Sequence, residues 1–522
     1  MSTASAEMPD GEESHLTVDG FWDMANEVLY SKVYFDPNTG EYVTIRPDSC
    51  SSDEMNMIIV SYISLCTTHS EEIGSLFEGG VDSFHYSAAK LLIDCSYYQE
   101  NLGFCIRKLL SLLNYIAQSA LTLAEGIEYD KGVGHEIEIK ETLNMNQRMV
   151  RTIGWILYIN YTANNSIMTV LEEFQGFITI CETLTCYCKL KEKLKDLPEY
   201  SDAIKNPYYS TYSNFLELLY EICKNSTISS EDLAAVDICF LEFLFKSLTI
   251  STRDEDELNF LKFKLLLVMN EQYMVSFYSS EEAERIPNKA FNAMIEGTNF
   301  RNFSECLMLN FNREKDHIIQ ILMLKVLYMV FTTSSTCQWF YLNDLKVLVD
   351  IFLRELNDLS LVEDEALINT YLRVIYPMLM FSVLKSESYK KESLVEVMRY
   401  LNSAEESAES TKRLSGRCLE LRALKFADEG DLLRKSFSSV SSSNSGMDMP
   451  DSPQVAASMG YHNATMLNDR DDAISITSNS SNGSSTKPRK RAPPPPLPRK
   501  MLGSRNSSSS DVALARTGRR VD

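Results

Sequence analysis

Apolar residues recur at spacings of three and four along most of the chain, which is the pattern of helices that bury one face. Residues 215–222 and 241–248 show this spacing most clearly. Further helices are predicted at about 53–68, 84–98, 102–124, 141–161, 166–185, 257–279, 314–334, 341–357, 363–385 and 391–404. Short polar stretches such as 225–227 separate them. The pattern predicts an all-α protein built as a stack of helices.

No strict fixed-period repeat is visible, but helix pairs recurring roughly every 40 residues are typical of degenerate armadillo or HEAT units. We therefore expect a helical-repeat solenoid. Two stretches depart from the helical pattern. Residues 33–45 hold two β-rich runs around the turn sequence Asp-Pro-Asn-Thr-Gly, which predicts a small N-terminal hairpin. Residues 197–212 hold two prolines and several tyrosines, which predicts an ordered loop between two halves of the stack.

The composition changes abruptly after about residue 426. Ser, Asn, Asp and Gly dominate residues 436–485, large apolar residues are sparse, and no amphipathic period remains. Such a segment cannot bury enough apolar surface to offset the entropy lost on ordering. The expected organisation is a disordered N-terminus at 1–14, a helical-repeat body at 15–427 and a disordered Ser-rich tail at 428–522.

The formal net charge of −23 is unevenly distributed. The tail holds 13 Lys and Arg against 10 Asp and Glu, a net charge of +3, which leaves −26 on the first 427 residues. An acidic body repels phosphate backbones and anionic lipids, so nucleic acid and membrane are disfavoured as partners and a basic protein surface is favoured.

The N-terminus lacks the pattern of a signal peptide, which predicts a cytoplasmic protein. The most apolar run, 319–331, is interrupted by Lys325 and is too short to span a bilayer.

No pattern of residues indicates an enzyme or a cofactor. The 12 cysteines are scattered, and the tightest group, Cys181, Cys186 and Cys188, has no histidine nearby, so reduced core thiols are favoured over a metal site. The sequence shows no phosphate-binding glycine loop and no zinc spacing, and its six histidines are dispersed.

The sharpest local signal is a basic, proline-rich run in the tail, formed around Ala492 by Lys490, Arg491, Pro493, Pro494, Pro495, Pro496, Leu497, Pro498, Arg499 and Lys500. Such a run forms a polyproline II helix in advance of binding, the shape that SH3 domains recognise together with one flanking cation. Lys490, Pro493 and Pro496 fit the forward orientation. Pro495, Pro498 and Lys500 fit the reverse one. The alternative is a stiff spacer.

Three motifs follow one another in the last part of the body: an apolar helix at 322–333, the turn Phe-Tyr-Leu-Asn-Asp-Leu at 340–345, and the helix Tyr-Leu-Arg-Val-Ile-Tyr-Pro at 371–377. In this combination and spacing the chain resembles the leucine-rich domain of the WISH/DIP/SPIN family. The match is strongest over 321–385, within a leucine-rich region at 314–404. The resemblance implies an armadillo-repeat protein that binds and activates the actin-related protein 2/3 complex and seeds linear filaments without a pre-existing filament. The low-dye-binding type of fungi, which acts at endocytic actin patches, also carries a C-terminal proline motif.

Eight residues of these motifs are candidates for a structural or partner-contacting role: Asn343, Asp344, Asp350, Arg354, Tyr371, Arg373, Tyr376 and Pro377. Asn343 and Asp344 are expected to cap a helix that begins near Leu345. Three polar residues lie within apolar helices: Asp350, Arg354 and Arg373. They are either paired inside the stack or presented to a partner. Pro377 is expected to kink its helix.

Two functions from different classes remain open at this stage. The first is activation of the actin-related complex, with SH3 proteins of the endocytic coat recruited by the tail. The second is a general helical-repeat adaptor that tethers SH3 proteins in trafficking or cell polarity without nucleation activity.

Overall fold

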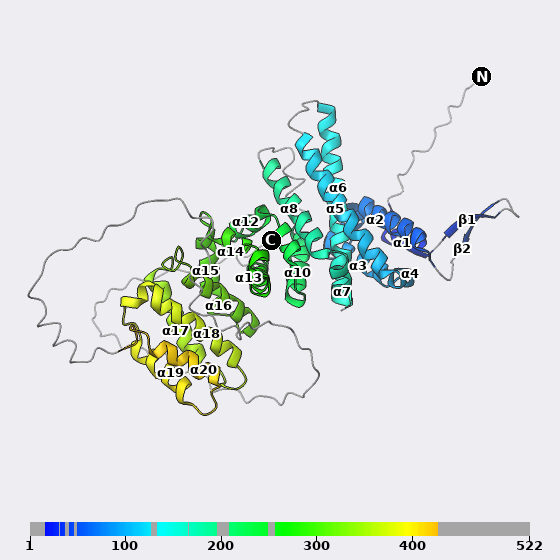
Figure 1. Ribbon diagram of the computed structural model, residues 1–522. Helices are drawn as coiled ribbons and strands as arrows, with labels where there is room; N and C mark the ends of the chain where they lie inside the picture. The colour runs from blue at the N-terminus through cyan, green and yellow to red at the C-terminus, as the bar shows by residue number, and fades with distance from the viewer. Residues whose placement is uncertain are drawn as a thin grey trace, which may run out of the picture. The chain divides into compact units, whose positions relative to one another are not determined.

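The computed structural model describes residues 16–30, 32–36, 41–45, 50–126, 133–164, 166–195, 208–248 and 256–425. Within these ranges the regular structure is helical apart from one two-stranded sheet (Figure 1). The predicted all-α solenoid is confirmed. Residues 1–14 and 428–522, including the proline motif, lie outside the described residues, so the order or disorder assigned to them stays a prediction.

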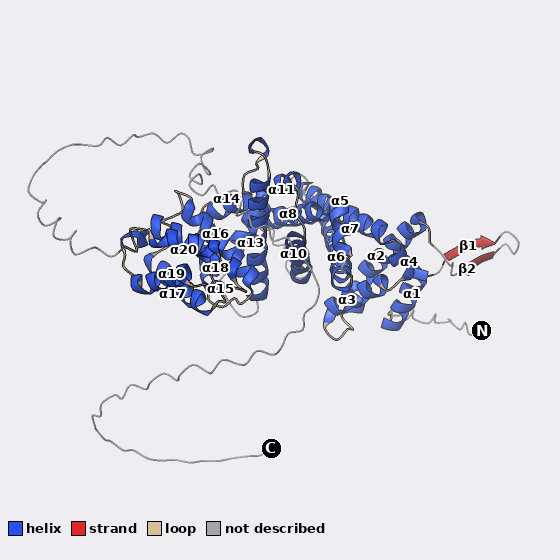
Figure 2. Cartoon of the chain, turned by 60° about the horizontal axis from the view of Figure 1, so that its bottom comes forward, coloured by secondary structure: helices blue, strands red, loops and turns tan. Residues whose placement is uncertain are grey.

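The strands form the predicted N-terminal hairpin (Figure 2). Strand β1 (Lys32–Asp36) pairs antiparallel with β2 (Glu41–Ile45), with Asp36 opposite Glu41 and Lys32 opposite Ile45. Residues 37–40, which connect the two strands in the sequence, lie outside the described part of the chain.

Four helices open the body: α1 (Val18–Tyr30), α2 (Ser52–Gly74), α3 (Gly80–Ile93) and α4 (Ser96–Glu100). A capping box fixes the start of α2. The Glu54 amide donates to the Ser51 hydroxyl at 3.4 Å, and the Ser51 amide donates to the Glu54 carboxylate at 2.8 Å. Two amides that would otherwise lack partners are satisfied in this way.

The later helices alternate between two layers. The first layer consists of α6 (Val133–Ala163), α10 (Tyr208–Asn225), α13 (Asp256–Ser279), α16 (His317–Thr332), α18 (Glu365–Phe381) and α20 (Glu409–Leu419). The second consists of α5 (Leu102–Gly126), α8 (Gly176–Leu194), α12 (Ile238–Lys246), α15 (Asn299–Phe311), α17 (Leu342–Asp358) and α19 (Lys391–Ser403). Each helix packs against the next in its own layer and against a partner in the other. Shorter elements lie between them: α7 (Ile167–Glu173), α11 (Ser230–Ala235), η2 (Glu282–Glu284), α14 (Lys289–Ile295) and η3 (Val383–Ser386).

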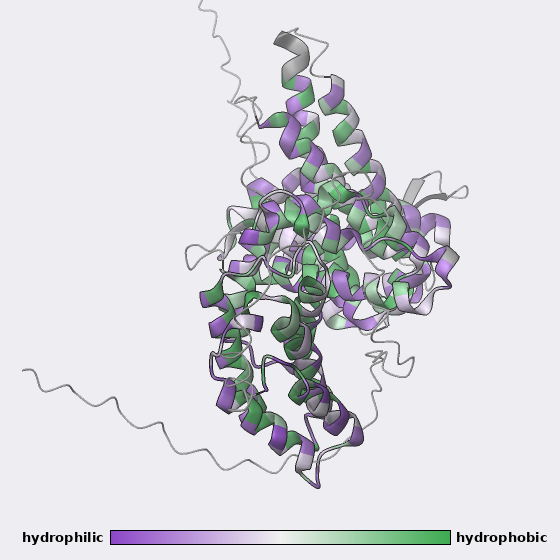
Figure 3. Ribbon diagram, turned by 60° about the vertical axis from the view of Figure 1, so that its left-hand side comes forward, coloured by the Kyte–Doolittle hydropathy of each residue, from purple (hydrophilic) through white to green (hydrophobic). Residues whose placement is uncertain are grey.

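One cluster of buried apolar side chains extends from Phe21 in α1 to Leu424 after α20 and joins both layers. Hydrophobic and hydrophilic positions alternate along the helices, as three-and-four spacing requires (Figure 3). A smaller cluster, which includes Leu143 and Leu190, joins the ends of α5, α6 and α8. None of the described helices is long and apolar enough to cross a bilayer.

Several predicted boundaries were wrong. The single helix expected at 84–98 is broken into α3 and α4, and the one expected at 166–185 into α7 and α8, where Gln175 has a left-handed φ of 57°. The loop expected at 197–212 is helical from Tyr208 onward, while 196–207 lie outside the described residues. Helices α1, α11, α14, α15 and α20 were not predicted. Two of them, α11 and α14, span only 6 and 7 residues, which is too short to display an apolar period.

Candidate functional site

The turn that precedes α17 does not use the predicted caps. The helix begins at Leu342, and Tyr341 occupies its N-cap position without a side-chain capping bond. Asn343 and Asp344 therefore lie in the first turn, and the prediction that they cap a helix from Leu345 was wrong. The Asp344 carboxylate still lies at the positive end of the helix dipole, which is favourable for a negative charge.

Asp350 links the middle of α17 to the start of α19. Its two carboxylate oxygens accept the Tyr389 hydroxyl at 3.0 and 3.1 Å, and the Lys390 ammonium donates to one of them at 2.8 Å. These hydrogen bonds favour the protonated donors, so they raise the pKa of both Tyr389 and Lys390. Lys390 precedes α19 with a left-handed φ of 47°. Asp350 thus orients the turn from which α19 begins.

Arg354 links the same helix to α15. Its guanidinium donates to the Glu355 carboxylate from two nitrogens, at 3.0 and 2.8 Å, and to the Asn312 side-chain oxygen at 2.9 Å. Asn312 directly follows α15. Asp350 and Arg354 are therefore both paired within the body, and together they tie α17 to its two neighbours in the second layer.

Tyr371 and Pro377 are packing residues of α18. The Tyr371 ring is fully buried and lies edge-on to Phe352 and Phe311, at centroid distances of 5.2 and 6.1 Å. Burial raises the pKa of its hydroxyl, which has no hydrogen-bond partner among the described residues. Pro377 is buried inside α18, and the helix continues past it to Phe381.

Arg373 and Tyr376 occupy the outer side of the same helix. Both are half-buried. The Arg417 guanidinium of α20 lies over the Tyr376 ring at 5.3 Å from its centroid, within the range of a cation–π contact. Of the eight motif residues, these two combine a polar group with a position at the surface of the first layer.

A hydrogen-bond network between α18 and α20 was not foreseen from the sequence. The Asn369 side-chain oxygen accepts from the Thr411 hydroxyl at 2.8 Å, and its amide nitrogen donates to Ser410 at 3.1 Å and to Glu365 at 3.2 Å. The Ser410 hydroxyl donates to Glu365 at 2.7 Å. An Asn within an apolar helix was the available signal, but two of its partners, Ser410 and Thr411, lie about 40 residues away in a helix that was not predicted.

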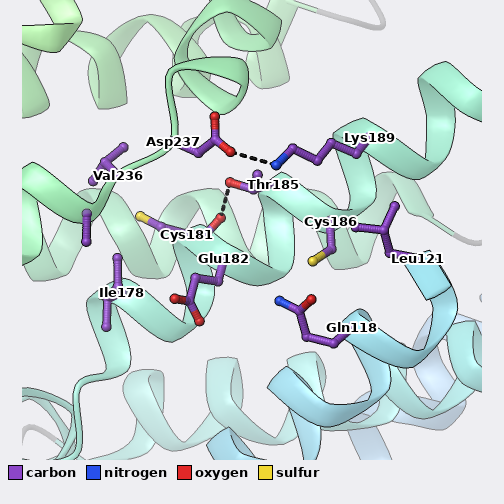
Figure 4. A pocket seen from close by; sticks show the side chains of 11 residues that line it. Gln118, Leu121, Ile178, Cys181, Glu182, Thr185, Cys186, Lys189, Val236 and Asp237 are labelled. Carbon is purple, nitrogen blue, oxygen red and sulfur yellow. Dashed lines mark hydrogen bonds and ion pairs between the residues drawn. The ribbon is translucent and has the colours of Figure 1, made fainter.

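A cavity of about 210 Å³ lies between α5, α8 and the link from α11 to α12 (Figure 4). The Lys189 ammonium donates to the Asp237 carboxylate at 2.7 Å on one side of it, and Glu182 and Gln118 project from α8 and α5 on the other. Its thiols belong to Cys181 and Cys186, whose pKa values burial raises, so both stay protonated near neutral pH. A protonated thiol is a poor nucleophile, so these two thiols do not make the cavity a reactive site.

The predicted core thiols are found in α8, where Cys181, Cys186 and Cys188 are all buried. Burial also raises the pKa of the Cys188 thiol. Across the described part of the chain, no group of three or more His, Cys, Asp or Glu side chains is arranged to hold a metal ion. The polar groups of the candidate region brace helices or face solvent, and the region as a whole is part of a helical solenoid.

Comparison with known proteins identifies the family. The family model described as SPIN90/Ldb17, leucine-rich domain, matches residues 255–394, from α13 into α19. Protein LDB17 of Eremothecium gossypii is 30% identical over 375 residues, which cover 69% of this chain and 72% of the relative. Protein LDB17 of Saccharomyces cerevisiae is 27% identical over 477 residues, covering 82% and 89%. Protein dip1 of Schizosaccharomyces pombe is 37% identical over 191 residues, covering 36% and 50%. The chain belongs to the SPIN90/Ldb17 family, the WISH/DIP/SPIN family that its motifs resemble, and is of the fungal type.

Proposed function

We propose that this chain binds and activates the actin-related protein 2/3 complex, and that it seeds linear filaments at cortical actin patches during endocytosis. Family membership is the observation that carries the proposal, because it relates the chain to actin regulators. The body at 15–427 is proposed to be the activating part, with the leucine-rich region at 314–404 as its family-specific portion. The protein is proposed to act in the cytoplasm.

The arrangement of α17 supports a mechanism based on binding rather than on chemistry. Arg354 and Asp350 tie this helix to α15 and α19, and these contacts limit its movement against both neighbours. A rigid surface that fits the active arrangement of the complex better than the inactive one shifts the equilibrium by its difference in affinity. About 1.4 kcal/mol of such preference is needed for each tenfold shift in population.

An actin assembly assay with purified components tests the activation. With the complex present and filament seeds absent, the full chain should shorten the polymerisation lag, while the chain without the complex should not. An unchanged lag would reject activation and favour an adaptor that only tethers SH3 proteins.

Removal of residues 436–522 separates the roles of the body and the tail. The motif helices lie upstream of this segment, so activation should persist in the shortened chain. Loss of activity in a shortened chain that still melts cooperatively would place the activating element in the tail.

The proline motif at 490–500 is proposed to recruit SH3 proteins of the endocytic coat. Pro498→Ala should weaken reverse-orientation binding at any salt concentration, because the ring fills a shape-selective slot. Lys500→Ala should matter chiefly at low ionic strength, where an exposed ion pair is less screened. Titration of tail peptides against a set of SH3 domains measures both effects. If neither change matters, the combined change of Lys490, Pro493 and Pro496 decides between the forward orientation and a spacer.

A further inference from the structure

A group of arginines and tyrosines gathers on three neighbouring helices of the first layer. Tyr328 lies on α16, Arg373 and Tyr376 on α18, and Arg413 and Arg417 on α20. Helix α18 packs against both α16 and α20 (Figure 1). We call these five residues the basic–aromatic patch. Tyr328, Arg373, Tyr376 and Arg417 are half-buried and Arg413 is exposed, so the patch belongs to the surface.

The charge of this region is opposite to that of the rest of the body. Residues 409–425 hold five Lys and Arg against two Asp and Glu, a net charge of +3, whereas the first 427 residues together carry −26. Despite this excess of carboxylates, no carboxylate pairs with Arg417 among the described residues, and its guanidinium is stacked on Tyr376 instead. The carboxylate of Glu409, on the same helix, pairs with Lys412 at 3.6 Å. A positive charge is therefore held at the surface in an otherwise acidic protein.

Apolar side chains continue the patch along α18. Arg373, Tyr376 and Met380 follow one another at spacings of three and four, so they share one face of the helix. Met380 is 36% exposed, and the next apolar residues, Phe381 and Val383, are 44% and 40% exposed. The surface thus offers cations and aromatic rings together with an apolar border.

We propose that the basic–aromatic patch binds a short acidic segment of a partner protein, in which carboxylates flank one large apolar side chain. The Arg417 guanidinium supplies charge-assisted hydrogen bonds to a carboxylate, and Tyr376 and Met380 supply apolar contact for the anchor. The positive charge of the patch is complementary to the carboxylates of such a segment.

The size of the patch favours a segment over a larger polyanion. Nucleic acid or an anionic membrane extends well beyond the patch, so it would come into direct contact with the negatively charged surface of the surrounding body. A short acidic segment contacts only the positive area. This binding does not depend on the proposed activation of the actin-related complex.

The test is a titration of the full chain against a fluorescent peptide of glutamates with one central tryptophan, followed by anisotropy. The double change Arg413→Glu and Arg417→Glu should raise the Kd by roughly tenfold or more, because two attractive charges become repulsive. The matched control is Arg399→Glu, an exposed arginine on α19 of the second layer, which should leave the Kd unchanged. Met380→Ser should weaken binding of this peptide but not of an all-glutamate peptide.

Equal affinity of the parent and the double variant would overturn the proposal. So would failure to bind the peptide while vesicles of phosphatidylserine and phosphatidylcholine bind through the same arginines, since the patch would then recognise lipid. If the double variant does not fold by thermal melting, Arg417→Gln provides the comparison and should still weaken binding. The titration contains no actin, so its result and that of the assembly assay are independent.

Discussion

The Lys325 ammonium on α16 donates to the Glu271 carboxylate on α13, and the two side chains are only 18% and 10% exposed. Lys325 is the charge that interrupts the most apolar stretch of the sequence. The second carboxylate oxygen of Glu271 is buried without a hydrogen-bond partner among the described residues. Neighbouring helices of the first layer are thus joined by an ion pair that is largely removed from water.

Breaking this pair on one side should destabilise the body. Lys325→Met leaves the Glu271 carboxylate desolvated and unpaired, and we expect the free energy of unfolding to fall by about 2–4 kcal/mol. The double change Lys325→Met and Glu271→Met should recover most of the loss, because it removes both charges from the interface. Urea denaturation of the parent and the variants measures both effects. A double variant as unstable as the single one would show that the side-chain shapes, and not the charges, matter at this contact.

The buried Tyr371 hydroxyl predicts a substitution that stabilises. It has no hydrogen-bond partner among the described residues, so Tyr371→Phe removes a desolvated polar group and should raise the free energy of unfolding by up to about 1 kcal/mol. Tyr273 is the matched control, because it is equally buried but donates to the Leu233 carbonyl at 2.9 Å. Tyr273→Phe should therefore cost about 1 kcal/mol. Effects of the same sign in both variants would contradict this explanation.

Local patterns were sufficient to predict elements whose own residues determine them. The hairpin of β1 and β2 follows from a turn sequence between two β-rich runs, and α17 follows from its regular apolar period. Where the backbone changes direction within an apolar stretch, the pattern failed. The left-handed Gln175 between α7 and α8 is an example, since the apolar spacing continues across the break.

The candidate site was predicted less completely, because its contacts join distant parts of the chain. The sequence indicated that Asp350 is either paired or presented, but its partner Tyr389 lies 39 residues further on. Arg417 was missed entirely, since Leu414, Cys418 and Leu419 are the only large apolar side chains of α20 and most of the helix is polar. The packing of helices within and between the two layers decides which helix faces lie next to each other. This packing cannot be read from a single sequence.

His85 predicts how stability depends on pH. Burial, with help from the nearby Arg151 charge, lowers its pKa to about 3, although the Asp82 carboxylate, paired with Arg151 at 2.6 Å, acts in the opposite direction. The folded protein therefore keeps this ring neutral, whereas the unfolded chain binds a proton with a pKa of about 6.5. Below that pH the unfolded state binds one more proton than the folded state. The free energy of unfolding therefore falls by up to about 1.4 kcal/mol for each unit by which the pH is lowered.

The reference variant for this experiment is His85→Leu, whose side chain cannot bind a proton. Between pH 7 and pH 5 the parent should lose about 2 kcal/mol more stability than this variant, whatever the variant's own stability at pH 7. Urea denaturation at each pH gives both curves. Parallel curves over this interval would show that His85 is protonated in the folded state as well.

Two glycines at the ends of helices form a matched pair. Gly74 is the last residue of α2 and is buried against α3, where an added Cβ would lie 2.9 Å from the Cα of Val81. Gly126 is the last residue of α5, and an added Cβ there would meet no atom of the described residues within 4 Å. The two positions have the same place in their helices and differ in what surrounds them.

Alanine should therefore have opposite effects at these positions. At Gly126 it restricts the unfolded chain and favours the helix, and we expect about 0.5 kcal/mol of stabilisation. At Gly74 the new methyl group meets backbone rather than a movable side-chain end, so α2 and α3 must separate, at a cost of roughly 1–3 kcal/mol. Thermal melting of the two variants beside the parent measures the difference. Stabilisation by Gly74→Ala would mean that α3 shifts without losing its contacts, and that the close approach of these two helices is not needed for the fold.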